Sequence, residues 1–107
     1  MDEERRRYPR YALDAPAKVA CEGAIFDGQL KDICHDAVLF EGAEACSLGA
    51  TAHITTEILG GSGRVEITGR VIRTAVLGDG KIAVAVLFTG LTPAAATQIE
   101  FFIQLQA

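Results

Sequence analysis

Four arginines lie within the first ten residues of the chain, and they are the first side chains whose type and spacing suggest chemistry. They are Arg5, Arg6, Arg7 and Arg10. An arginine guanidinium offers parallel N–H donors that match phosphate oxygens or the O6/N7 edge of guanine, and it stacks on flat rings. Arg6 and Arg10 stand four residues apart on a segment stiffened by Pro9, so they could hold one anionic ligand from two sides. The alternative is a solvated chain end, which composition alone favours.

A second polar group follows an apolar run, in residues 32–37 (DICHDA). Side chains two positions apart on a strand share a face, so Asp32 and Cys34 are expected to point to the same side. The Asp32 carboxylate could accept hydrogen bonds from the N1–H and N2–H groups of a guanine. The alternative is a turn in which the aspartate bonds to its own backbone.

Other catalytic or metal-binding chemistry has little support in the sequence. Cys34 and His35 are neighbours on an expected strand, so they would face opposite sides and could not act together as nucleophile and base. The three cysteines form no C-x-x-C pair and the two histidines are scattered, which argues against a zinc site. Residues 60–63 lack the lysine of a Walker-type loop. We therefore expect no enzyme, no catalytic residue, no metal and no cofactor.

The composition is that of one folded domain. The 107 residues carry 14 acidic and 10 basic side chains, half of the residues are hydrophobic, and the mean hydropathy is +0.25. This balance excludes a disordered chain and argues against broad nucleic-acid binding. The longest apolar run has seven residues, against the roughly 20 needed to cross a bilayer. With no secretory signal and an odd number of cysteines, we expect a cytoplasmic protein with reduced thiols and no membrane insertion.

Short runs separated by glycine-containing turns predict about six strands and one helix. The strands are expected at residues 17–22, 24–33, 37–41, 51–58, 64–73 and 81–88. Gly28 is a candidate bulge inside the second run. Thr92 and Pro93 predict a helix over about 93–105, with a hydroxyl at the N-cap and a proline at the first helical position. One apolar stripe of this helix comprises Ala95, Ile99, Phe102 and Ile103.

The fold class that follows is all-β with one C-terminal α-helix. Regular turn spacing and the lack of intervening helices favour a six-stranded antiparallel β-barrel, which removes sheet edges, with the helix covering one opening. We expect a single barrel domain at residues 13–107, preceded by a flexible arginine-rich arm at residues 1–12. No repeat or linker marks a second domain.

In order and spacing, the two polar groups resemble the motifs of the PilZ family, bacterial receptor domains for cyclic di-GMP. The resemblance covers essentially the whole chain. It implies that Arg6 and Arg10 match the family's two arginines, that Arg5 matches an extra arginine often found before them, and that they grip the phosphates and guanines. In this family the extra arginine goes with binding of a ligand pair, so we expect two ligand molecules per chain.

The second motif of the family is matched at Asp32 but changed at two other positions. Cys34 stands in place of a serine and Ala37 in place of a glycine. A thiol is a weaker hydrogen-bonding group than a hydroxyl, and alanine is strained if the position requires a positive φ. The resemblance implies a cyclic di-GMP site made of Arg5, Arg6, Arg10, Asp32, Cys34 and Ala37.

The sequence thus predicts a stand-alone cyclic di-GMP receptor that relays the signal to an unidentified protein partner in trans. Ligand binding would order the arm and create a new surface for that partner. An alternative is an adaptor of the same fold that binds no nucleotide, which the changes at Cys34 and Ala37 favour. A third hypothesis is a barrel for single-stranded nucleic acid. The chain has no tryptophan and its strands carry little positive charge, so we expect no DNA or RNA partner.

Overall fold

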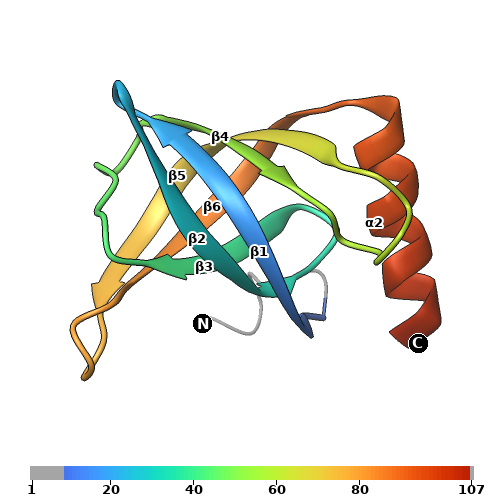
Figure 1. Ribbon diagram of the computed structural model, residues 1–107, viewed down its shortest axis with the longest axis horizontal. Helices are drawn as coiled ribbons and strands as arrows, with labels where there is room; N and C mark the ends of the chain where they lie inside the picture. Colours follow the sequence, from blue (N-terminus) through green and yellow to red (C-terminus); the bar gives the residue numbers. More distant parts are fainter. Residues whose placement is uncertain (1–8, 107) are drawn as a thin grey trace.

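Six strands of the computed structural model, which describes residues 9–106, close into an antiparallel barrel (Figure 1). They are β1 (Tyr11–Cys21), β2 (Ala24–Ile33), β3 (Ala37–Gly42), β4 (Thr51–Thr56), β5 (Val65–Val76) and β6 (Ile82–Leu91), and helix α2 (Pro93–Gln106) follows them. The order around the barrel is β1-β2-β3-β6-β5-β4, and β4 closes the circle by pairing with β1. The expected fold class is confirmed.

The first strand is longer than the sequence predicts. Tyr11 and Ala12, which the sequence places in the arm, are the first two residues of β1. Pro16, which precedes the predicted start of the strand at residue 17, lies inside the strand opposite Gln29. Its carbonyl oxygen accepts a hydrogen bond from the hydroxyl of Thr56 at 3.0 Å. Proline lacks only the N–H donor, so its acceptor can still tie β1 to the neighbouring strand.

The barrel interior is filled by the inward positions of the strands. The largest fully buried side chains are Phe40, Leu30, Ile33, Ile54, Ile67, Val19, Val38, Val71, Val84 and Val86. Val19 and Cys21 on β1 point inward, as their alternation with polar neighbours predicts. These buried side chains form one packed core inside the barrel, and this core fixes the positions of the strands that carry the outward-facing residues.

Helix α2 begins with the predicted N-cap and packs its predicted stripe on the barrel. The Ala95 N–H donates to the Thr92 hydroxyl at 3.1 Å, which satisfies one of the open donors of the first turn. Ala95, Ile99 and Ile103 are buried, and Phe102 is half-buried against the core. The helix contacts β5 and β6 and lies beside one end of the barrel (Figure 1).

Gly28 does not form the expected bulge. It pairs in regular register with Ala17 on β1 and with Gly42 on β3. A Cβ atom at this position would lie 3.2 Å from the ring of Phe40 and 3.4 Å from the Glu41 carbonyl oxygen. The glycine therefore makes room for a core aromatic ring, and the prediction of a bulge there was wrong.

The irregularity of β2 lies three residues later, at Lys31. Two residues of β1, Leu13 and Asp14, stand opposite Lys31, and Lys31 has no partner on β3. The extra residue changes the alternation, so Leu30 and Ile33 are both fully buried and Asp32 between them is partly exposed. This bulge places Asp32 on the outside of the barrel.

A second bulge lies in β5. Val71 pairs with the buried Val86 and Arg73 pairs with Ala85, which leaves Ile72 as the extra residue. Without the bulge, Arg73 would share the inward face of Val71, because side chains two apart on a regular strand point the same way. The bulge instead places Arg73 on the outer face.

Candidate functional site

One row of outward-facing residues crosses four neighbouring strands. Asp32 on β2 pairs with Leu39 on β3, Leu39 pairs with Ala85 on β6, and Ala85 pairs with Arg73 on β5. Residues paired across strands lie on the same face of the sheet. The row therefore has a carboxylate at one end, a guanidinium at the other, and two apolar side chains between them.

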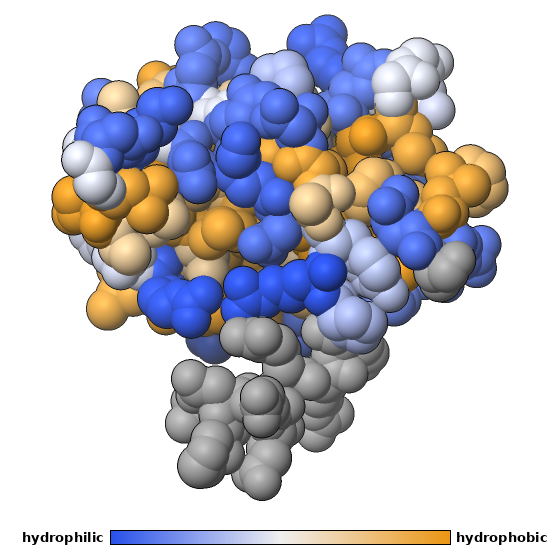
Figure 2. Space-filling view, turned by 90° about the horizontal axis from the view of Figure 1, so that it is seen from below, coloured by the Kyte–Doolittle hydropathy of each residue, from blue (hydrophilic) through white to orange (hydrophobic). Residues whose placement is uncertain are grey.

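A pocket of about 280 Å³ lies over this row. It is lined by Arg10, Asp32, Cys34, Ala37, Val38, Leu39, Ile72, Arg73 and Ala85. Small-molecule sites commonly combine an apolar floor with a few polar groups at the edges, and this pocket has that arrangement. Viewed from below, the molecule shows a hydrophilic band between two hydrophobic regions (Figure 2).

Arg10 and Asp32 form an ion pair on one side of the pocket. Nη1 of Arg10 lies 3.8 Å from Oδ2 of Asp32, and the two side chains are 35% and 25% exposed. A partly solvated pair at this distance contributes only about 0–1 kcal/mol to stability. A ligand can therefore replace this contact between Arg10 and Asp32 with little loss of folding stability.

Cys34 lines the same pocket as Asp32, as their spacing predicts, and its thiol is held by a neighbour. Sγ donates to Oδ1 of Asp36 at 3.0 Å, and the Cys34 N–H donates to the Ala37 carbonyl oxygen at 2.9 Å. Burial raises the pKa of the Cys34 thiol, and the hydrogen bond to Asp36 raises it further. The thiol therefore stays protonated at neutral pH and acts as a donor rather than as a nucleophile.

Ala37 is not strained. It is the first residue of β3 and pairs with Leu87. Among the non-glycine residues from 9 to 106, only Glu22 has a positive φ, at 54°. The loop before β3 closes through the Phe88 N–H, which donates to the Asp36 carbonyl oxygen at 2.8 Å, and leaves extended backbone at Ala37. The position therefore does not require a positive φ, the condition under which alanine would be strained, and the methyl group of Ala37 lines the pocket.

His35 turns away from Cys34. Its Nε2 lies 3.6 Å from Oε1 of Glu100 on α2, while the Cys34 thiol bonds to Asp36. The two neighbours thus have different partners, as their positions predict. Within the described part of the chain, no group of three or more His, Cys, Asp or Glu side chains could hold a metal ion. No helix in residues 9–106 is long and apolar enough to span a membrane.

The structure brings four of the six predicted site residues to one pocket: Arg10, Asp32, Cys34 and Ala37. Arg5 and Arg6 lie outside the described residues.

Three further residues of this row were not predicted from the sequence, because their common face depends on strand pairing and on the bulge at Ile72: Arg73, Leu39 and Ala85. One signal was present. Regular alternation from Val71 puts Arg73 inside a barrel, and a charged residue at an inward position indicates a bulge.

Comparison with known proteins points to one family. A family model described as "PilZ domain" matches residues 4–105. No match was found among the curated proteins.

The solved structures that resemble the chain share its fold at low sequence identity. The inhibitor of motility MotI/DgrA of Bacillus subtilis superposes with a TM-score of 0.76 at 14% identity over 95% of this chain and 51% of that one. The PilZ domain of YcgR from Escherichia coli, solved with c-di-GMP, gives 0.71 at 16% identity over 94% of this chain and 90% of that one. MrkH of K. pneumonia, in complex with c-di-GMP, gives a TM-score of 0.72 at 18% identity over 92% of this chain and 51% of that one. The chain thus spans about half the length of MotI/DgrA and MrkH.

Proposed function

Because this chain belongs to the PilZ family, we propose that it is a receptor for cyclic di-GMP. One observation carries the proposal: Arg10, from the start of the chain, meets Asp32, Cys34 and Ala37, from the end of β2 and the start of β3, around a single pocket. Two similar structures, the YcgR domain and MrkH, were solved with c-di-GMP. The proposed role is that of a receptor rather than an enzyme.

The proposed ligand matches the chemistry of the pocket. Cyclic di-GMP carries two phosphates and two guanines. An arginine guanidinium can pair with the phosphate anions, stack on the guanine rings and donate hydrogen bonds to the guanine edges. Arg10 exchanges its pairing with Asp32 for the ligand, and Arg5 and Arg6 add cations from the same segment. Asp32 then accepts from the N1–H and N2–H groups of a guanine.

The two changed residues weaken the proposed site without closing it. The Cys34 thiol already donates its hydrogen bond to Asp36, and it is a weaker hydrogen-bonding group for the ligand than a serine hydroxyl would be. The Ala37 methyl group occupies part of the pocket wall, but its backbone needs no rearrangement. We therefore expect binding to be measurable and weaker than in a site with serine and glycine.

Calorimetric titration of the whole chain with cyclic di-GMP tests the proposal. GTP and a single-stranded oligonucleotide serve as control ligands with the same kinds of chemical group. We expect heat of binding with cyclic di-GMP alone. The absence of binding by a folded protein would overturn the receptor function.

The relay to a protein partner in trans is part of the same proposal. The loop that follows Asp32 is tied to β6 through the Phe88 N–H and to α2 through the His35–Glu100 contact. A ligand that moves this loop therefore acts on two elements away from the pocket. The partner would meet the protein in the cytoplasm, where the buried thiols of Cys21, Cys34 and Cys46 stay reduced.

A second candidate function is an adaptor that binds no nucleotide. The observation in its favour is that both altered residues, Cys34 and Ala37, line the pocket itself. In that case Arg10 and its neighbours would serve a protein contact. A folded protein that gives no heat with cyclic di-GMP, yet retains a partner in its native host, would favour the adaptor.

A further inference from the structure

Arg73 lies on the outer face of the barrel, at the opposite rim of the pocket from Arg10 and Asp32. It comes from β5, far along the sequence from both of them, and only the bulge at Ile72 turns it outward. Among residues 9–106 it forms no hydrogen bond or ion pair, whereas Arg10 is paired with Asp32. Arg73 is therefore a cation at the rim of a pocket with its donors unused by the described part of the protein.

The apolar floor between the two ends of the row can support the flat face of a ligand ring. Leu39 and Ala85 lie side by side on β3 and β6, and the methyl group of Ala37 lies next to them. Adjacent strands are about 4.8 Å apart, so three strand steps separate the backbones of Asp32 and Arg73 by roughly 14 Å. That span leaves room for one purine ring together with hydrogen bonds from a side chain at each end.

The ends of the row match two different edges of one guanine. A carboxylate accepts from the N1–H and N2–H donors of guanine, and an arginine donates a bidentate pair to its O6 and N7 acceptors. Asp32 and Arg73 present these two chemistries from opposite ends of an apolar floor. Adenine would offer an amino donor to the arginine in place of O6, so the pair would select guanine.

We propose that Arg73 is a ligand-binding and specificity-determining residue, which reads the O6/N7 edge of a guanine that lies on Leu39 and Ala85 with its other edge on Asp32. The proposal rests on the receptor function proposed above. It adds a base-reading arginine from β5 to a site otherwise made from the start of the chain and the end of β2.

The test compares Arg73→Ala with Arg64→Ala in the full chain. Arg64 is also an exposed arginine without a partner among the described residues, and it lines a separate pocket beside Thr55 and Glu57. Each variant removes one positive charge, so their comparison separates a local contact from a general loss of charge. We expect Arg73→Ala to weaken cyclic di-GMP binding by about tenfold or more and Arg64→Ala to change it less than about twofold. Both should leave the apo melting temperature nearly unchanged, since neither side chain is packed.

Two further measurements identify the contact as a base edge. Arg73→Lys keeps the charge but loses the fork, so it should bind nearly as weakly as Arg73→Ala. An analogue of cyclic di-GMP that contains 7-deazaguanine lacks N7. It should bind the unaltered protein more weakly than cyclic di-GMP does, and this difference should shrink or vanish in Arg73→Ala.

Each outcome has a definite meaning. Equal affinities of Arg73→Ala and Arg64→Ala would overturn the role of Arg73 while the receptor function stands. Full binding by Arg73→Lys would overturn the reading of a base edge. If the unaltered protein binds no cyclic di-GMP, the receptor function and the role of Arg73 both fail.

Discussion

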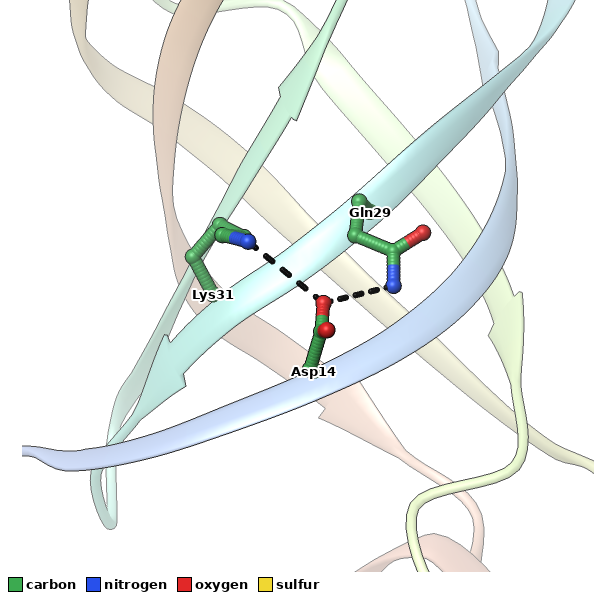
Figure 3. Close-up of polar contacts among 3 residues, drawn as sticks. All are labelled: Asp14, Gln29 and Lys31. Carbon is green, nitrogen blue, oxygen red and sulfur yellow. Dashed lines mark hydrogen bonds and ion pairs between the residues drawn. The ribbon is translucent and has the colours of Figure 1, made fainter.

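Two parts of the outer barrel surface carry similar side chains and use them differently. On the outer face of β1 and β2, the Gln29 amide donates to the Asp14 carboxylate at 2.7 Å and the Lys31 ammonium lies 3.4 Å from it (Figure 3). On the same face, Lys18 donates to Asp27 at 2.7 Å. These charges satisfy one another. Across β2, β3, β6 and β5, in contrast, the Asp32 carboxylate and the Arg73 guanidinium lie at opposite ends of an apolar floor.

The difference separates a solvated surface from a candidate binding surface. In the first region every acid has a close donor, so a ligand would have to displace an existing contact to gain a new one. In the pocket, Arg73 has no partner among the described residues and the Arg10–Asp32 distance is 3.8 Å, longer than a hydrogen bond. Charge alone therefore does not mark the site, whereas a guanidinium such as that of Arg73, with its donors unused by the described residues and apolar surface beside it, does.

The largest effect that would sharpen this contrast is expected from Arg10→Ala. Loss of a charge-assisted contact in the pocket should weaken cyclic di-GMP binding by about a hundredfold or more. The apo melting temperature should hardly change, because the ion pair with Asp32 is partly solvated. Lys18→Ala is the matched control from the self-paired face and should bind normally. If Lys18→Ala weakens binding as much as Arg10→Ala, the contrast between the two faces is broken.

The next effect concerns stoichiometry and lies in the arginine-rich segment. We predict two molecules of cyclic di-GMP per chain, because Arg5 adds a cation and a stacking plane for a ligand pair with four negative charges. Arg5→Ala should then bind one. Calorimetry of both proteins measures the ratio directly, and a one-to-one titration of the unaltered chain would contradict the prediction.

A smaller gain is expected from restoring the second motif. Cys34→Ser provides a hydroxyl that can serve the ligand, worth about 0.5–1.5 kcal/mol, and Ala37→Gly opens the pocket wall. Because Ala37 carries no backbone strain, no relief of strain adds to this gain. The double variant should bind cyclic di-GMP about fivefold more tightly. An unchanged affinity would mean that neither side chain limits binding.

The smallest effect is expected on the self-paired face, from Asp14→Asn. Hydrogen bonding from Gln29 and the charge of Lys31 lower the pKa of Asp14 in the folded protein. A lowered folded-state pKa stabilises the protein above the unfolded pKa, and this contribution disappears as the pH falls through the folded one. Thermal melts should therefore show the unaltered protein slightly more stable than the variant at pH 7 and equal to it in strong acid. Cyclic di-GMP binding at pH 7 should not change, and a clear loss would give this face a role in the site.

The sequence predicted what depends on local pattern and missed what depends on closure of the barrel. Alternation around Val19 and the N-cap at Thr92 are properties of a few neighbouring residues, so both were confirmed. The bulges at Lys31 and Ile72 arise where strands of different lengths must share one closed register. The spacing of Asp32, Cys34 and Ala37 therefore predicted one side of the pocket. Arg73, on the opposite side, had no local signal in the sequence except its charge.

The charge of Arg73 also fixes the register in which β5 and β6 pair. If Ile72 took a regular place opposite Ala85, the bulge would disappear and Arg73 would move to the inward position opposite the fully buried Val84. An unpaired charge in such a core costs several kcal/mol, a large share of the stability of a small domain. The bulged pairing is therefore kept because the regular pairing would bury the guanidinium. Related chains with an apolar residue at this position should be free to lose the bulge.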